Sequence, residues 1–140
     1  MPKILGIDYG GKRIGIAVAD TDTGIAMPLS VVAGRNDVTR DARNVADLGQ
    51  REAAESFVVG LPLNMSDEGA TDSSQTTLTR QFAAELERLS GKPVHLQDER
   101  LTSYAAHEVL DEAAIPPKRR KRLTDMIAAQ KILQAYLDQP

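Results

Sequence analysis

The stretch ILGIDYGGKRIGIAVAD, residues 4–20, is the feature that most restricts the fold of this chain. Two runs rich in Ile and Val, 3–9 and 13–20, flank a Gly-Gly-Lys turn, which predicts two strands joined by a tight hairpin. Asp8 lies inside the first run, where an ionised carboxylate is unfavourable unless a partner replaces its lost water. The partner is either the backbone N–H groups of the turn or a cation.

The rest of the chain predicts alternating strands and helices. We expect further strands at 27–33, 56–63 and 93–97, and helices at 36–50, 78–89, 102–114 and 120–137. The apolar face of the helix at 78–89 would consist of Leu78, Phe82, Leu86 and Leu89. A polar loop fills 64–77, and strand, helix and strand in that order favour a crossover onto a parallel strand. We therefore expect one α/β domain over residues 1–140, beginning with three antiparallel strands.

Composition excludes several classes of protein. The 140 residues contain no Cys, so a disulfide framework, a thiolate metal site and a thiol nucleophile are all excluded. No apolar stretch approaches the roughly 20 residues that a membrane span needs, so we expect a cytoplasmic protein without membrane contact. The net charge of −3 argues against indiscriminate nucleic-acid binding. The basic residues are nevertheless concentrated in one unbroken run, Lys118, Arg119, Arg120, Lys121 and Arg122.

Two further carboxylates stand where the expected fold would bring them near Asp8. Glu99 lies just past the strand at 93–97, which is a candidate neighbour of the first strand. Asp125 shares one face of the last helix with Ala129, Ile132 and Tyr136. Because an apolar helix face of this kind packs on a sheet, Asp125 is expected to point at the sheet and not at water.

Converging carboxylates repel one another unless a cation lies between them. Mg²⁺ or Mn²⁺ accepts such hard oxygen ligands, and two ions about 4 Å apart can activate a water and stabilise the leaving oxygen of a phosphodiester. The sequence thus predicts a site for one or two such ions, and His95 and His107 are too isolated to form another. Simpler roles stay open for each acid: a turn cap for Asp8, an exposed strand end for Glu99, and first-turn helix stabilisation beside an N-cap Thr124 for Asp125.

Four stretches, taken in order, resemble the YqgF (RuvX-like) family. They are DYGGKRIGIAVA from Asp8, VVGLPLNM at 58–65, DERLTS at 98–103, and D-x-x-A-A-x-x-I-L from Asp125 to Leu133. The ordered set covers nearly the whole chain. The resemblance implies a ribonuclease-H-like fold, with a mixed five-stranded sheet flanked by helices. It also implies a metal-dependent nuclease, described as a processing enzyme for the 5′ end of pre-16S rRNA in ribosome biogenesis or as a Holliday junction resolvase.

The resemblance assigns roles to individual residues. Asp8, Glu99 and Asp125 correspond to the family's acidic residues, so they are the implied catalytic metal ligands. Other positions match the family's motifs: Lys12, Arg13, Asn64, Arg100, Thr102 and Ser103. Met126 departs from the Ser that often follows the last acid, which removes a hydroxyl close to the site. Asp98 is a candidate fourth acid, although strand alternation directs it away from Glu99.

Candidate substrate contacts lie on both sides of the predicted acids. Lys12, Arg13, Asn64 and Arg100 are placed to meet a phosphate or its neighbours, and the run 118–122 begins the last helix. Because Lys and Arg oppose the helix dipole there, phosphate binding explains the run better than stability does, with a solvated face as the alternative. Aromatic residues are few, so we expect recognition of shape and backbone without extensive base stacking.

Two other functional classes compete with a nuclease. Sugar kinases and chaperone ATPases of the actin-like superfamily also begin with strand, Asp, Gly-containing turn and strand, but they need two lobes to hold nucleotide and lack the DER segment. A nucleic-acid-binding module without catalysis is disfavoured by the intact acids, although Met126 leaves room for it. For a nuclease, the substrate is a structured RNA precursor or branched DNA, and symmetrical junction cleavage would call for a homodimer.

Overall fold

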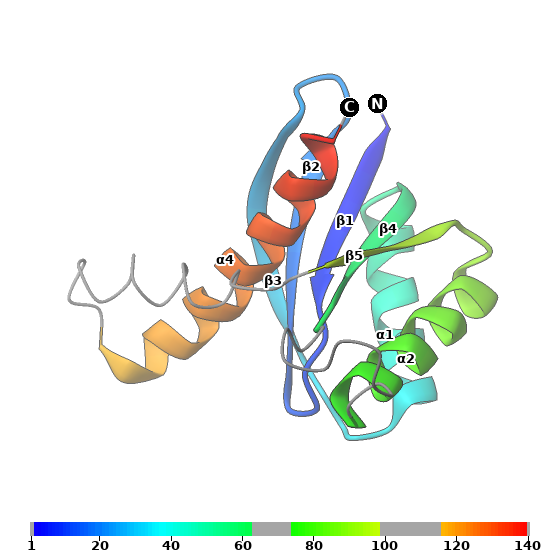
Figure 1. Ribbon diagram of the computed structural model, residues 1–140, viewed down its shortest axis with the longest axis vertical. Helices are drawn as coiled ribbons and strands as arrows, with labels where there is room; N and C mark the ends of the chain where they lie inside the picture. Colours follow the sequence, from blue (N-terminus) through cyan, green and yellow to red (C-terminus); the bar gives the residue numbers. More distant parts are fainter. Residues whose placement is uncertain (1, 63–73, 99–115, 140) are drawn as a thin grey trace, which may run out of the picture.

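One mixed sheet of five strands forms the centre of the molecule (Figure 1). The computed structural model describes residues 2–62, 74–98 and 116–139. The strands are β1 (Lys3–Asp8), β2 (Arg13–Asp20), β3 (Ile25–Ala33), β4 (Ala54–Leu61) and β5 (Val94–Asp98), in the spatial order β3-β2-β1-β4-β5. The β1–β2 and β2–β3 pairs are antiparallel, whereas β4 is parallel to both β1 and β5. The predicted fold class, including the three antiparallel strands, is therefore confirmed.

Helices cover both faces of the sheet (Figure 1). They are α1 (Val38–Arg51), α2 (Ser74–Ser90) and α4 (Pro117–Leu137). The loop expected at 64–77 is wrong at its end, because residues from Ser74 onward are helical; its earlier part and the helix expected at 102–114 lie outside the described residues. Within the described part of the chain, no helix is both long and apolar enough to cross a membrane.

Alternate residues of β1 face different helices. Leu5 and Ile7 are fully buried in a core shared with α1 and α2, whereas Ile4 belongs to a second core under α4. This alternation follows from the two-residue period of a strand. Asp8 therefore lies on the α4 face of the sheet, and Tyr9, directly after it, joins the core on the α1 and α2 face.

The inward face of α2 differs from the predicted one. Phe82 and Leu86 are buried as expected, but Leu78 is 42% exposed. Thr76 and Thr79 take inward positions instead, because the Thr76 hydroxyl donates to the Pro62 carbonyl at 2.5 Å and the Thr79 hydroxyl donates within its own helix. Once their hydroxyls are hydrogen-bonded, burying these two residues no longer leaves a polar group unpaired.

The last helix lies close against the sheet because the strand residues beneath it are small. A Cβ at Gly6 would lie 2.6 Å from the Cβ of Leu133 and 2.9 Å from the carbonyl oxygen of Ala129. Ala17, Ala19 and Ala26 continue this surface and are buried with Ala129, Ile132 and Leu133. The predicted inward direction of the Ala129 and Ile132 face is confirmed.

The start of α4 differs from the sequence expectation. The helix begins at Pro117, with Pro116 as the N-cap, because proline is preorganised for the first helical position. Thr124 is therefore not an N-cap, and Asp125 lies beyond the first turn. Helix-end stabilisation, considered above as a role for Asp125, falls off within the first turn and does not explain this residue.

Candidate functional site

Asp8 and Asp125 both lie next to Gly15, on the same face and near the same end of the sheet. Asp8 is the last residue of β1 and pairs with Gly15 of β2. Helix α4 packs directly on Gly15: a Cβ there would overlap the carbonyl oxygen of Asp125 and lie 3.1 Å from its Cβ. Both acids thus come from distant parts of the chain to the same face and the same end of the sheet.

The carboxyl end of strand β5 lies at the same end of the sheet as Asp8. It runs parallel to β4, which runs parallel to β1, so the carboxyl ends of all three strands lie together. The α4-facing residues of β5 are His95, whose ring stacks on Tyr136 at 5.2 Å, and Gln97, which accepts a hydrogen bond from Gln139 at 2.6 Å. Alternation then places Asp98 on the opposite face, away from Asp8, so its candidacy as a fourth acid on this face fails.

Several predicted site residues lie outside the described residues. They are Glu99, which directly follows β5, together with Asn64, Arg100, Thr102 and Ser103. In the part of the chain that the structure describes, no three His, Asp or Glu side chains form a group that could hold a metal ion. Of the three predicted metal ligands, the structure describes Asp8 and Asp125, and Met126 directly follows Asp125 within α4.

Arg13 makes a direct ion pair with Asp125. Its Nε donates to Oδ2 of Asp125 at 2.7 Å, with the Arg13 side chain 43% exposed and the Asp125 side chain 19% exposed. Arg13 is the first residue of β2, so the hairpin that carries Asp8 also orients the acid on α4. Lys12, in the turn before it, is exposed. One basic and one acidic residue of the predicted site are therefore in contact.

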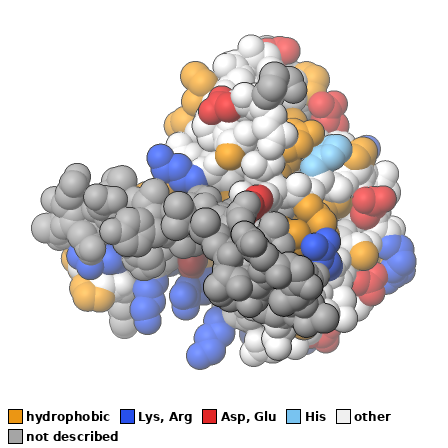
Figure 2. Space-filling model, viewed as in Figure 1, with side chains coloured by type: hydrophobic (Ala, Val, Ile, Leu, Met, Phe, Trp, Pro, Cys, Tyr) orange, Lys and Arg blue, Asp and Glu red, His pale blue; other side chains and the backbone are white. Residues whose placement is uncertain are grey.

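The basic run occupies the first two turns of α4. Arg119, Lys121 and Arg122 are exposed, while Arg120 is partly buried. Figure 2 shows Lys and Arg side chains gathered around the beginning of α4 and extending toward the hairpin end of the sheet. The run thus lies on the same helix as Asp125 and leads away from it along the surface.

Comparison with known proteins decides the family. The chain matches the family described as "RuvX: Holliday junction resolvase" over residues 2–139. The chain belongs to the RuvX family. This confirms the resemblance drawn from the four sequence stretches.

Relatives and solved structures agree with this assignment. A protein of Maridesulfovibrio salexigens named "Putative pre-16S rRNA nuclease" is 40% identical over 137 residues, covering 96% of this chain and 97% of its own. A protein of Syntrophomonas wolfei with the same name is 43% identical over 136 residues, covering 97% and 94%. The structure of T. thermophilus RuvC in complex with Holliday junction substrate has a TM-score of 0.61 at 18% identity, covering 98% and 94%. That last similarity shows the shared ribonuclease-H-like fold.

A buried acid that the sequence interpretation missed lies behind the site of this RuvX-family chain. Asp41, in the first turn of α1, is 0% exposed. Its Oδ1 accepts from the backbone N–H of Arg35 at 2.9 Å, and its Oδ2 accepts from the Tyr9 hydroxyl at 3.4 Å. The signal was present in the sequence, because Asp41 shares a helical face with Ala42 and Val45, just as Asp125 shares one with Ala129.

Tyr9 is held on the opposite side of the sheet from Asp8. Its ring stacks on Phe82 with centroids 4.2 Å apart, and its carbonyl accepts from Gln75 Nε2 at 3.2 Å. Burial, followed by the charge and the hydrogen bond of Asp41 and the charge of Asp37, raises the pKa of Tyr9 from 10.0 to about 12. The hydroxyl therefore stays a donor to Asp41 across the neutral and moderately alkaline range.

This raised pKa predicts a loss of stability at high pH. The unfolded chain ionises Tyr9 near its ordinary pKa of 10.0 and the folded chain only near 12, so its contribution is fully present below pH 10 and is lost as pH rises toward 12. Urea denaturation at pH 9 and pH 11.5 should show wild type losing about 2 kcal/mol more than Tyr9→Phe. An equal loss in both proteins would contradict the buried, Asp41-bonded hydroxyl.

The contact between Gly15 and Asp125 predicts a second effect. Gly15→Ala should lower the free energy of unfolding by about 1–3 kcal/mol through overpacking and should also displace Asp125, measurable as a lower Tm and slower cleavage. Gly6→Ala is the matched control, because it overpacks the same helix against Leu133, two turns from Asp125. If both variants lose stability and activity in the same proportion, Gly15 has no specific role in placing Asp125.

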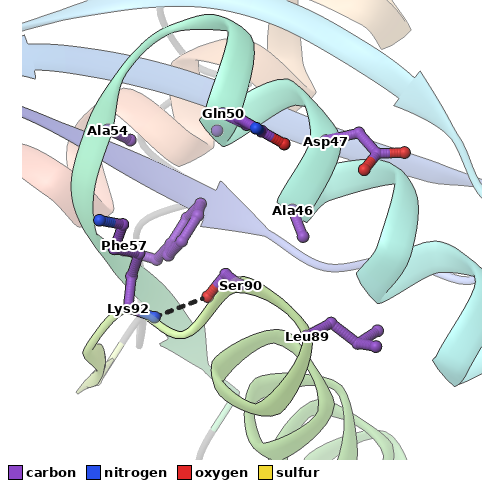
Figure 3. A pocket seen from close by; sticks show the side chains of 9 residues that line it. Ala46, Asp47, Gln50, Ala54, Phe57, Leu89, Ser90 and Lys92 are labelled. Atoms are coloured by element: carbon purple, nitrogen blue, oxygen red, sulfur yellow. Dashed lines mark hydrogen bonds between the residues drawn. The ribbon is translucent and has the colours of Figure 1, made fainter.

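A pocket lies at the other end of the sheet. It measures about 320 Å³ and is bounded by α1, the beginning of β4 and the end of α2. Figure 3 shows the Phe57 ring extending into it, with Asp47 and Lys92 at its rim and the backbone N–H of Lys92 bonded to Ser90. Because β4 begins here and Asp8 ends β1, the pocket is separate from the acids of this RuvX-family site.

Proposed function

We propose that this protein is a divalent-metal-dependent nuclease that hydrolyses phosphodiester bonds, with Asp8, Glu99 and Asp125 as its metal ligands. The observation that carries the proposal is the packing of Asp125 on Gly15, the residue paired with Asp8. A set of carboxylate oxygens without Cys or clustered His fits Mg²⁺ or Mn²⁺ better than softer metals. Family membership and the names of the relatives support nuclease chemistry.

Residues around the acids have distinct tasks in this proposal. A bound divalent ion would supply Lewis-acid activation of a water and stabilise the charge on the leaving oxygen. Asp8, at the end of a central strand, and Asp125, paired with Arg13, would provide carboxylate oxygens as ligands of this ion. Because Asp98 faces the other way, Asp8, Glu99 and Asp125 are the acids that would hold the ion.

Cationic side chains near the acids would bind the substrate backbone. Arg13 lies 2.7 Å from Asp125, and its guanidinium retains further N–H donors in a geometry that suits phosphate. Lys12 is exposed beside it, and Arg119, Lys121 and Arg122 extend the positive surface along α4. Asn64, Arg100, Lys118 and Arg120 complete the proposed substrate contacts. A phosphate near the acids would thus meet the hairpin, and flanking phosphates the helix.

The substrate we propose is the 5′ end of pre-16S rRNA. Relatives that are 40% and 43% identical over nearly their whole length carry the name of a pre-16S rRNA nuclease. A second candidate, a Holliday junction, is favoured by the description of the matching family. Cutting a four-way junction symmetrically would require two copies of the chain, whereas trimming a leader would not.

A cleavage assay separates these candidates. The purified protein is incubated with Mn²⁺ and, in parallel, with a labelled rRNA-precursor 5′ leader, a labelled four-way DNA junction, and ATP. We expect cleavage of the leader and none of ATP. Preferential cutting of the junction would favour the resolvase, and nucleotide turnover without strand cleavage would contradict a nuclease of either kind.

A further inference from the structure

Asp41 is buried in a way that its place in α1 does not explain. An acidic residue in the first turn of a helix is stabilised by the helix dipole, and the Asp37 side chain already caps this helix by accepting from Arg40 N–H at 3.1 Å. Neither effect requires complete burial, which is rare for Asp unless it is paired. Both carboxylate oxygens of Asp41 instead accept from groups outside α1.

One of these groups, the Arg35 N–H, belongs to a segment that is hydrogen-bonded to the β1–β2 turn. Three successive backbone N–H groups between β3 and α1 are all donated: Gly34 to the Lys12 carbonyl at 2.9 Å, Arg35 to Asp41 at 2.9 Å, and Asn36 to the Gly11 carbonyl at 3.3 Å. Asn36 has a left-handed φ of 54°, a conformation that persists only where its surroundings hold it. Asp41 therefore anchors the middle of a segment whose two ends are hydrogen-bonded to the turn.

The other group is the residue next to the proposed metal ligand. Tyr9 follows Asp8 directly, and its hydroxyl donates to Asp41 at 3.4 Å while its ring stacks on Phe82. Asp41 thus reaches the hairpin at two points, before the turn through Tyr9 and at the turn through Gly11 and Lys12. Because Asp41 is on the α1 and α2 side of the sheet and Asp8 on the α4 side, this effect passes through the backbone.

We infer that Asp41 is a positioning residue that fixes the β1–β2 turn, and with it the orientation of Asp8 and Arg13. This inference rests on the proposed function, since it assigns Asp41 a role in the geometry of the proposed metal site. Loss of the carboxylate frees the Arg35 N–H and the Tyr9 hydroxyl together. The turn then gains freedom at both attachment points, and the two site residues that flank it lose their fixed geometry.

The test compares Asp41→Ala with Val45→Ala, a buried control one turn further along the same helix that takes no part in these hydrogen bonds. Two quantities are measured without nucleic acid: amide hydrogen exchange of Gly34 and Asn36, whose N–H groups donate to the carbonyls of the turn, and the Kd for Mn²⁺ by titration calorimetry. We expect Asp41→Ala to speed exchange of the Gly34 and Asn36 amides about tenfold and to weaken Mn²⁺ binding on the order of 10- to 100-fold, as for other groups that orient metal ligands. Val45→Ala should change neither more than about twofold, although it also lowers Tm.

Each outcome assigns a cause. If Asp41→Ala does not fold, Asp41→Asn and Tyr9→Phe replace it, because each keeps the shape while weakening one contact, and each should give a smaller change of the same sign. Equal effects of the Asp41 and Val45 variants on exchange and Kd would overturn the inference and leave Asp41 a structural residue. If wild type and Asp8→Asn bind Mn²⁺ equally, the proposed metal site fails, while faster exchange of the Gly34 and Asn36 amides in Asp41→Ala would still support the anchoring role.

Discussion

Asp8→Asn should abolish metal-dependent cleavage and leave the protein folded. The substitution keeps the size of the side chain but removes the charge that a divalent ion requires at the end of β1. We expect the cleavage rate to fall by about 10³-fold or more, beyond the 10- to 100-fold typical of groups that only orient a ligand. Stability should stay unchanged or rise slightly, because one of two neighbouring negative charges is removed. Initial rates on labelled substrate at fixed Mn²⁺, together with Tm, measure both effects.

Asp47→Asn is the matched control for this experiment. Asp47 is exposed, lines the pocket at the opposite end of the sheet, and its substitution changes the net charge by the same amount. It should retain the wild-type cleavage rate at every Mn²⁺ concentration. If Asp8→Asn also cleaves at the wild-type rate, Asp8 is not a metal ligand. Capping of the β1–β2 turn would then be the better explanation of this residue.

The meeting of Asp8 and Asp125 could be predicted because it depends on local periodicity. Asp8 was singled out as a carboxylate inside an apolar strand, and the 3.6-residue period placed Asp125 on the same face as Ala129 and Ile132. The start of α4 was predicted wrongly, yet the face was right, because facing depends on spacing and not on where a helix begins. The close approach itself, through Gly15, depends on packing that no single stretch of sequence reveals.

Features set by distant partners could not be predicted. Leu78 was expected inside, but the bond from Thr76 to the Pro62 carbonyl turns a different face of α2 inward. The partners of Asp41, Tyr9 and the Arg35 N–H, become adjacent only when the sheet and α1 are assembled. Glu99, Asn64 and Arg100 lie outside the described residues, and their roles stay predictions of the sequence.

Neutralising the exposed part of the basic run should weaken nucleic-acid binding and reduce its salt dependence. The sharpest variant changes Arg119, Lys121 and Arg122 to Gln and keeps Arg120, whose Nε is buried. If all three contact phosphates, the slope of log K against log salt should become less steep by about 2–3 and the affinity should fall on the order of 10- to 100-fold at moderate salt. Stability should rise slightly, because positive charge leaves the N-terminal end of a helix.

These opposite signs distinguish substrate binding from a structural role, since a merely damaged fold would lose affinity and stability together. The control changes Arg40, Arg43 and Arg51, which are exposed on α1 at the other face of the sheet, to Gln and alters the net charge equally. Binding is measured by fluorescence anisotropy from low to physiological salt. An equal change of slope in both triple variants would mean that the protein's overall charge governs binding and that the run on α4 is a solvated face. A change confined to the α4 variant would place the substrate backbone along the helix that carries Asp125.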